Sequence, residues 1–143
     1  MRVERATQAS SELLEALRRL LPQLSPGRPA PTTAELKELM AAHGSTLLLA
    51  RDEDGHIVGT LTLVVFRTTT ELRARIEDVV VEESARGKGL GEALVREALR
   101  LARERGARSV NLTSRPDREA ADRLYARVGF EQHDTNVYSF ELE

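Results

Sequence analysis

Apolar residues recur at spacings of three and four along the first part of the chain, a pattern that predicts amphipathic helices. Leucines follow this spacing over residues 11–21 (SELLEALRRLL). The next stretch, 22–31, holds four of the five prolines, and we expect a loop there because proline cannot continue a helix. A second helix is expected over 32–43, where Gly44 ends it.

Apolar runs rich in branched residues follow and predict strands. Between the first two runs, Asp54 and Gly55 are a strong signal for a hairpin turn. After a short strand near the start of the chain, the expected strands are 46–52, 57–66, 72–81, 109–113, 130–133 and 137–142, with further helices over 90–105 and 118–128. This order predicts a single domain, 1–143, of mixed α/β class, with a central sheet of about seven strands flanked by about four helices.

Composition narrows the chemistry that is available. The chain has 143 residues, with 21 Lys plus Arg against 23 Asp plus Glu, and the net charge of −2 argues against a nucleic-acid partner. The absence of Cys excludes thiolate zinc sites and a cysteine nucleophile, and His43, His56 and His133 lack metal-ligand spacing, so no metal is expected. The sequence shows neither a secretory signal nor an apolar run long enough for a bilayer, so we expect a cytoplasmic protein without a membrane partner.

The most informative stretch is 79–95 (VVVEESARGKGLGEALV), in which a strand leads through residues 86–91 directly into a helix. Glycines at such a junction let several backbone N–H groups close on one ligand, and the helix N-terminus adds unpaired donors and partial positive charge. Together with Arg86 and Lys88, this pattern predicts a phosphate or pyrophosphate site. Its spacing fits neither the P-loop nor the dinucleotide fingerprint, and the alternative is a glycine-rich turn before a core helix.

A second segment, 118–130 (REAADRLYARVGF), places Tyr125 late in a helix, before Gly129 and Phe130. Its apolar residues have helical spacing, so the pattern on its own is typical of core packing. Only the combination with the glycine-rich segment gives it a more specific meaning.

The two segments together resemble the acyl-coenzyme A site of the GNAT-type N-acetyltransferase superfamily, in particular its small single-domain bacterial members. Arg86, Gly89 and Gly91 match the family's [QR]-x-x-G-x-[GA] signature, and residues 121–130 match its closing A-x-x-L-Y-x-x-x-G-F pattern. The run 76–81 (IEDVVV) resembles that of glucosamine-phosphate N-acetyltransferases. The resemblance covers nearly the whole chain, in the order of elements as well as in these motifs.

The resemblance implies acetyl-coenzyme A as cosubstrate, with its pyrophosphate on the loop 86–91 and its pantetheine arm between the strands 76–81 and 109–113. Arg118 stands where many members of the family carry an Asn that helps to hold this arm, and it could reach a phosphate instead. The residues that the resemblance assigns to cosubstrate binding are Val79, Val80, Val81, Arg86, Gly87, Lys88, Gly89, Leu90, Gly91, Glu92, Asn111, Arg118 and Ala121.

The family's reaction is a direct attack of the substrate amine on the acetyl carbon in a ternary complex, which needs no acyl-enzyme. The amine must lose a proton, since alkylammonium pKa values are about 10, and Glu77 and Asp78 are the candidate bases, directly or through a water. Alternation places the two acids on opposite faces of the strand, so at most one faces the substrate cleft. Of the two we favour Glu77, and the alternative is a structural role for both. Tyr125 has the position that the family uses to protonate or hydrogen-bond the leaving thiolate.

The function implied by the resemblance is an acetyl-coenzyme A-dependent N-acetyltransferase that acts on a primary amine of a small molecule or peptide. The alternative is a non-catalytic acyl-coenzyme A-binding or sensing domain, which would need neither Tyr125 nor an acid. In the family the acceptor is recognised by segments that correspond to 22–35, 67–72 and 131–138, which hold no decisive cluster here. The apolar residues of 137–140 are compatible with a homodimer through late strands.

Overall fold

The computed structural model describes residues 1–115 and 118–142, which divide into two compact units, Met1–Thr113 and Ser114–Glu143. The first unit contains β1 (Arg2–Arg5), α1 (Ser11–Leu24), α2 (Thr33–Ala41), β2 (Ser45–Arg51), β3 (Ile57–Arg67), β4 (Leu72–Val81), the 3-10 helix η1 (Glu83–Ala85), α3 (Leu90–Glu104) and β5 (Val110–Asn111). The second unit contains α4 (Glu119–Val128). Among the described residues, no helix is both long enough and apolar enough to cross a bilayer.

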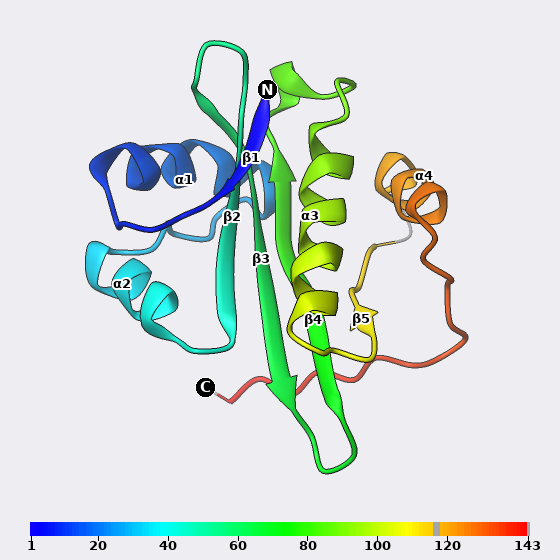
Figure 1. Ribbon diagram of the computed structural model, residues 1–143. Coiled ribbons are helices and arrows are strands. Elements are labelled where there is room, and N and C mark those ends of the chain that lie inside the picture. Colours follow the sequence, from blue (N-terminus) through cyan, green and yellow to red (C-terminus); the bar gives the residue numbers. More distant parts are fainter. Residues whose placement is uncertain (116–117, 143) are drawn as a thin grey trace. The chain divides into compact units, whose positions relative to one another are not determined.

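The strands of the first unit form a mixed sheet in the order β1-β2-β3-β4-β5. Neighbouring strands from β1 to β4 are antiparallel, whereas β5 runs parallel to β4. Helices α1 and α2 lie on one face of this sheet and α3 on the other (Figure 1). The predicted mixed α/β class with helices on both faces is therefore confirmed, but the predicted number of strands is too high, since the described residues form five.

The helices that cover the sheet bury the apolar faces that the sequence predicted. In α1, Leu13, Leu17 and Leu20 are at most 3% exposed, and the Ser10 hydroxyl caps the helix by accepting the N–H of Leu13 at 3.1 Å. On the other face of the sheet, Leu94 of α3 is fully buried. Burial of each leucine side chain contributes about 1.5–3 kcal/mol, so these faces hold both layers against the sheet.

Helix α1 continues through Pro22, although the sequence predicted a loop from that residue onward. Proline lacks an N–H, but in the last turn it removes only one helical hydrogen bond. The N–H of Ser25 donates to the carbonyl of Leu21 at 2.9 Å and closes the turn. Because Leu21 and Leu24 pack against the core, burial outweighs the missing hydrogen bond.

Helix α2 begins with a capping box, as its sequence permits. The Thr32 hydroxyl accepts the N–H of Glu35 at 3.1 Å, and the Glu35 carboxylate accepts the N–H of Thr32 at 2.9 Å. The helix ends at Ala41, earlier than predicted, and Gly44 has a different role from the one expected. Its carbonyl accepts the N–H of Val65 at 2.7 Å, and a Cβ on Gly44 would lie 2.3 Å from the Val65 carbonyl oxygen. Gly44 therefore permits close approach to β3.

Strand β4 contains a bulge that the sequence pattern did not reveal. Before the bulge, Glu77 of β4 pairs with Thr62 of β3. Val80 pairs with Thr60, so two residues of β4 lie opposite one residue of β3. Asp78, within the bulge, has φ 51 and is the one non-glycine residue with positive φ in the described part of the chain. The strict alternation of side chains, from which we predicted that Glu77 and Asp78 lie on opposite faces of the strand, is interrupted here.

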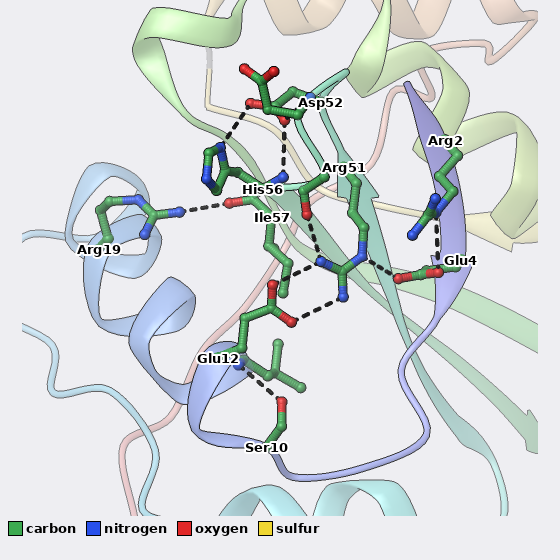
Figure 2. A network of polar contacts seen from close by, with 12 residues as sticks. Arg2, Glu4, Ser10, Glu12, Arg19, Arg51, Asp52, His56 and Ile57 are labelled. Carbon is green, nitrogen blue, oxygen red and sulfur yellow. Dashed lines mark hydrogen bonds and ion pairs between the residues drawn. The ribbon is translucent and has the colours of Figure 1, made fainter.

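Arg51 of β2 joins three elements of the first unit through its guanidinium (Figure 2). It donates to the carboxylate of Glu4 in β1 and, at 2.8 and 3.1 Å, to that of Glu12 in α1. It also donates to the carbonyl of Gly55 in the β2–β3 turn at 2.7 Å. The hydrogen bonds from Arg51 lower the pKa of Glu4 and of Glu12, so both carboxylates stay ionised in this network.

The second unit is built around α4 and the chain that follows it. Gly129 ends the helix in the left-handed conformation, with φ 119, and the N–H groups of Gly129 and Phe130 both donate to the Tyr125 carbonyl. The predicted strands 130–133 and 137–142 are wrong, since the described residues after α4 form no strand. A strand needs a neighbouring strand to pair its N–H and carbonyl groups, and the described part of this unit offers none.

Candidate active site

Two glycines in the left-handed region shape the loop between β4 and α3. Gly87 has φ 82 and Gly89 has φ 81, a conformation that residues with a Cβ rarely adopt. A Cβ built on either glycine would meet nothing within 4 Å. The backbone conformation, and not crowding, therefore requires glycine, and the space beside the loop is open to a ligand.

The start of α3 offers hydrogen-bond donors to that space. The helix has no side-chain cap, and in the described part of the chain the N–H groups of residues 88–91 have no acceptor. Arg86 and Lys88 are exposed, and Arg86 Nε donates to the Val81 carbonyl at 3.0 Å, which ties the loop to the end of β4. Unpaired N–H groups, the positive end of a helix and two cations are the donor set that a pyrophosphate requires, so these residues fit that group.

Strand β4 has an open edge next to this loop. β5 pairs with β4 at Ala74 and Arg75, and beyond them no described strand lies beside residues 76–81 on that edge. β5 is shorter than the predicted strand because its pairing with β4 ends at Asn111. Val80 is 4% exposed, so its side chain belongs to the core and only its backbone faces this edge. An amide-containing ligand can pair with such an edge as an added strand does.

Two residues that the resemblance assigned to the cosubstrate lie at the margins of this region. Glu92, in the first turn of α3, receives a hydrogen bond from Arg96 Nε at 2.9 Å. Asn111 is exposed and pairs with Arg75 in the last rung of the β4–β5 ladder. The structure therefore places Asn111 where the open edge begins, and Glu92 beside the loop but within an ion pair.

The two candidate bases have different surroundings. Glu77 accepts a hydrogen bond from Arg75 Nε at 2.8 Å and is part of a partly exposed ion pair. Asp78 lines a pocket of the first unit, whereas Glu77 does not. The structure thus places Asp78, and not the favoured Glu77, at a cavity, because the bulge redirects the chain between them. Non-glycine residues with positive φ are concentrated at functional positions, which agrees with this placement.

The pocket that contains Asp78 is formed by α1, α2, their connecting loop and the middle of the sheet. It has a volume of about 340 Å³ and is lined by Leu17, Leu21, Pro29, Pro31, Glu35, Leu36, Leu39, Leu47, Thr60, Thr62 and Asp78. The sequence pointed to 22–35 as a recognition segment but missed the contribution of β2 and β3. Thr60 and Thr62 were the available signal, as polar residues within an otherwise apolar strand.

The second unit holds Arg118, Ala121 and Tyr125. Arg118 is the N-cap residue of α4, and its carbonyl accepts the N–H of Asp122 at 3.0 Å. The Tyr125 ring meets the Phe130 ring edge to face, with centroids 5.7 Å apart. Burial, and then the charge of Asp122, raise the pKa of Tyr125, while Arg118 acts in the opposite direction. Tyr125 therefore keeps its proton at neutral pH and is able to donate it.

A further polar group that the sequence did not point out lies in the β2–β3 turn (Figure 2). Ligand atoms of Asp52, Asp54 and His56 lie within 4.8 Å of one another. The Asp52 carboxylate accepts the N–H groups of His56 and Asp54, both at 2.9 Å, and the hydrogen bond from His56 is the main reason that the pKa of Asp52 is lowered. Such side-chain contacts are typical of Asp in turns, so the conformation of the hairpin turn is enough to explain why these side chains lie close together.

Comparison with known proteins agrees with the arrangement of the loop and the sheet. Residues 11–130 match the acetyltransferase (GNAT) family. The chain is 32% identical over 126 residues to glucosamine 6-phosphate N-acetyltransferase 1 of Oryza sativa subsp. japonica, which covers 82% of this chain and 74% of that protein. It is 34% identical over 95 residues to glucosamine 6-phosphate N-acetyltransferase of Trypanosoma brucei brucei, which covers 64% of this chain and 63% of that protein. A crystal structure of an acetyltransferase from Trypanosoma brucei has a TM-score of 0.79 at 26% identity, over 98% of this chain and 99% of that one.

Proposed function

The chain belongs to the acetyltransferase (GNAT) family and is an N-acetyltransferase, and from this premise we propose that it transfers the acetyl group of acetyl-coenzyme A directly to the primary amine of a small molecule. Strand β4 is the observation that carries the proposal. It holds Asp78 in the pocket and ends at the glycine-rich loop, so one rigid element joins an acid for the acceptor to a donor set for the cosubstrate.

The cosubstrate side is made mainly of backbone groups. Acetyl-coenzyme A supplies the acetyl group as a thioester when it is bound. The N–H groups of residues 88–91, with Arg86 and Lys88, bind its pyrophosphate, and the open edge of residues 76–81 pairs with the amides of its pantetheine arm. A backbone N–H of β4 near the bulge hydrogen-bonds the thioester carbonyl, where negative charge develops during the reaction.

The proton transfers fall to two side chains. The acceptor ammonium group gives one proton to water before it reacts, because only the neutral amine attacks. Asp78 accepts, directly or through a water, the second proton, which the nitrogen loses as it bonds to the acetyl carbon. Tyr125 gives a proton to the sulfur that leaves with the electron pair of the broken carbon–sulfur bond, and its raised pKa keeps that proton available. Atoms and charge therefore balance with no covalent bond to the enzyme, which agrees with a chain that has no Cys.

The test is release of free thiol from acetyl-coenzyme A in the presence of a panel of amines. The panel comprises polyamines, amino sugars including glucosamine 6-phosphate, amino acids, aminoglycosides and peptides with a free N-terminus. We expect thiol release with at least one small amine, together with an equal amount of acetylated amine detected by mass spectrometry. Tight binding of acetyl-coenzyme A without release on any amine would contradict the proposal and identify an acyl-coenzyme A-binding module.

A further inference from the structure

Among the described residues, those that line the pocket around Asp78 include negatively charged side chains and no positively charged ones. Its apolar walls are formed by five leucines and two prolines, and its ionisable side chains are Glu35 of α2 and Asp78 of β4. No Lys, Arg or His is found among the described residues that line it. Both residues are exposed, and their carboxylates, beside apolar walls, attract cationic ligands and repel anionic ones.

Glu35 is held in a defined orientation by the capping box of α2. Its Oε1 accepts the N–H of Thr32 at 2.9 Å, while its own N–H donates to the Thr32 hydroxyl at 3.1 Å. In the described part of the chain Oε2 has no partner. One oxygen therefore fixes the side chain, and the other is available to a ligand.

We propose that this pocket selects a small acceptor with two ammonium groups and no phosphate or carboxylate, that is, a linear diamine. The proposal rests on the proposed function and names its substrate class. Asp78 receives the amine that reacts, Glu35 pairs with the second ammonium group, and the leucine and proline walls contact the methylene chain between them. The volume of about 340 Å³ lies at the lower end of the range of ~300–1,000 Å³ for ligand pockets, which favours a short diamine over a peptide.

The same lining disfavours a sugar phosphate, which the names of two relatives specify as their substrate. A phosphate is bound by Arg, Lys or an uncapped helix N-terminus. The described residues that line this pocket include no cation, and the N-terminus of α2 is already capped by Thr32 and Glu35.

The test compares acceptors that have the same length and differ in their terminal group. The probes are 1,5-diaminopentane, pentylamine, 5-aminopentanoate and glucosamine 6-phosphate, each assayed by thiol release. For 1,5-diaminopentane we expect a kcat/KM about fivefold above that of pentylamine, the size of effect that an exposed ion pair can supply, with 5-aminopentanoate below pentylamine. Glucosamine 6-phosphate is expected to be a poorer acceptor than the diamine.

Glu35→Gln separates ligand recognition from a purely structural role of this residue. Glutamine can also form the capping box, so α2 and the melting temperature should be preserved while the charge is removed. We expect the diamine-to-pentylamine ratio of kcat/KM to fall from about five to about one, as the loss of an exposed ion pair implies. Glu38→Gln, on the same helix but outside the pocket lining, is the matched control and should leave the ratio unchanged.

The outcomes distinguish this inference from the function on which it rests. Preference for 5-aminopentanoate or glucosamine 6-phosphate, or an unchanged ratio in Glu35→Gln, would overturn the diamine assignment while acetyl transfer stands. Absence of thiol release on every acceptor would overturn the proposed function, and the diamine assignment with it. A diamine preference that depends on Glu35 supports both.

Discussion

The glycine-rich loop and the pocket around Asp78 are built in different ways, although both adjoin β4. The loop presents backbone N–H groups at the start of α3, and glycine is required at positions 87 and 89 by their φ angles. The pocket presents side chains that come from α1, α2, the loop between them and three strands. A site that binds through backbone groups suits the part of a ligand that many enzymes share. The specificity of a site that binds through side chains can be changed by substituting single residues. The donor side is therefore expected to be generic and the acceptor side specific.

The largest expected effect is on the acceptor side, at Asp78. Asp78→Asn removes the proposed base, and asparagine tolerates the positive φ of the bulge, so the fold should be retained. We expect kcat to fall about 100- to 1,000-fold, as is usual for loss of a general base, while affinity for coenzyme A is nearly unchanged. Steady-state kinetics and calorimetric binding of coenzyme A check the two halves of this prediction.

The matched control for that variant is Glu77→Gln, which removes the neighbouring acid and its ion pair with Arg75. Its turnover should stay within about threefold of the unmodified enzyme, since exposed ion pairs contribute little. A larger loss of kcat in Glu77→Gln than in Asp78→Asn would return the role of base to Glu77, the acid that we favoured from the sequence.

On the donor side, Gly89→Glu should have the next largest effect. The substitution adds strain at φ 81 and places a carboxylate beside the pyrophosphate site. We expect affinity for coenzyme A to fall about 100-fold, because strain and repulsion act together, and the rise in melting temperature on addition of coenzyme A to disappear. Gly55→Glu is the control, since Gly55 has a similar φ of 85 and open space but lies in the β2–β3 turn, outside the loop. A normal rise in melting temperature for Gly89→Glu would show that the loop is not the cosubstrate site.

Tyr125→Phe tests whether the second unit contributes a proton donor. Loss of one hydrogen bond to a developing thiolate should lower kcat about tenfold, with cosubstrate affinity unchanged. Because burial raises the pKa of Tyr125, its neutral form persists beyond the usual value of about 10, so Tyr125 should not produce a fall in rate below that pH. A pH–rate profile checks this, and turnover equal to that of the unmodified enzyme would remove Tyr125 from the mechanism.

The smallest expected effect is that of Arg86→Ala, since backbone groups dominate the loop. Loss of one exposed cation should weaken coenzyme A binding about threefold to fivefold, and the difference should shrink at high salt. Arg103→Ala is the control, because this exposed arginine lies at the opposite end of α3, about 20 Å from the loop at 1.5 Å per residue. An effect of Arg86→Ala as large as that of Gly89→Glu would mean that side chains, and not the backbone, hold the pyrophosphate.

The sequence predicted the elements that depend on local pattern. The apolar spacing of α1 and α3, the turn at Gly55 and the start of α3 next to Gly89 are all found in the structure. Predictions failed where packing or pairing competes with local preference. Pro22 stays within α1 because the partly buried leucines on either side of it pack against the core. Residues 130–142 form no strand in their own unit because the described residues there supply no partner strand.

Asp78 shows most clearly what the chain alone could not reveal. Alternation along a regular strand placed Glu77 and Asp78 on opposite faces but could not decide which of them lines a pocket. The answer depends on a bulge, which is defined by the register between β4 and β3 and therefore exists only when both strands are paired.

By itself, the sequence determined the mixed α/β class, the family and the position of the glycine-rich loop, because each depends on short stretches of contiguous residues whose backbone preferences are local. The tertiary structure decided the shape and charge of the pocket that we propose for the acceptor. That pocket brings Glu35, Thr60 and Asp78 together from elements far apart in the chain, and only the packing of two helices against the paired strands does so. A loop that binds through its backbone can be recognised from the spacing of its glycines in the sequence. A pocket formed by side chains from several elements arises only when the chain is folded.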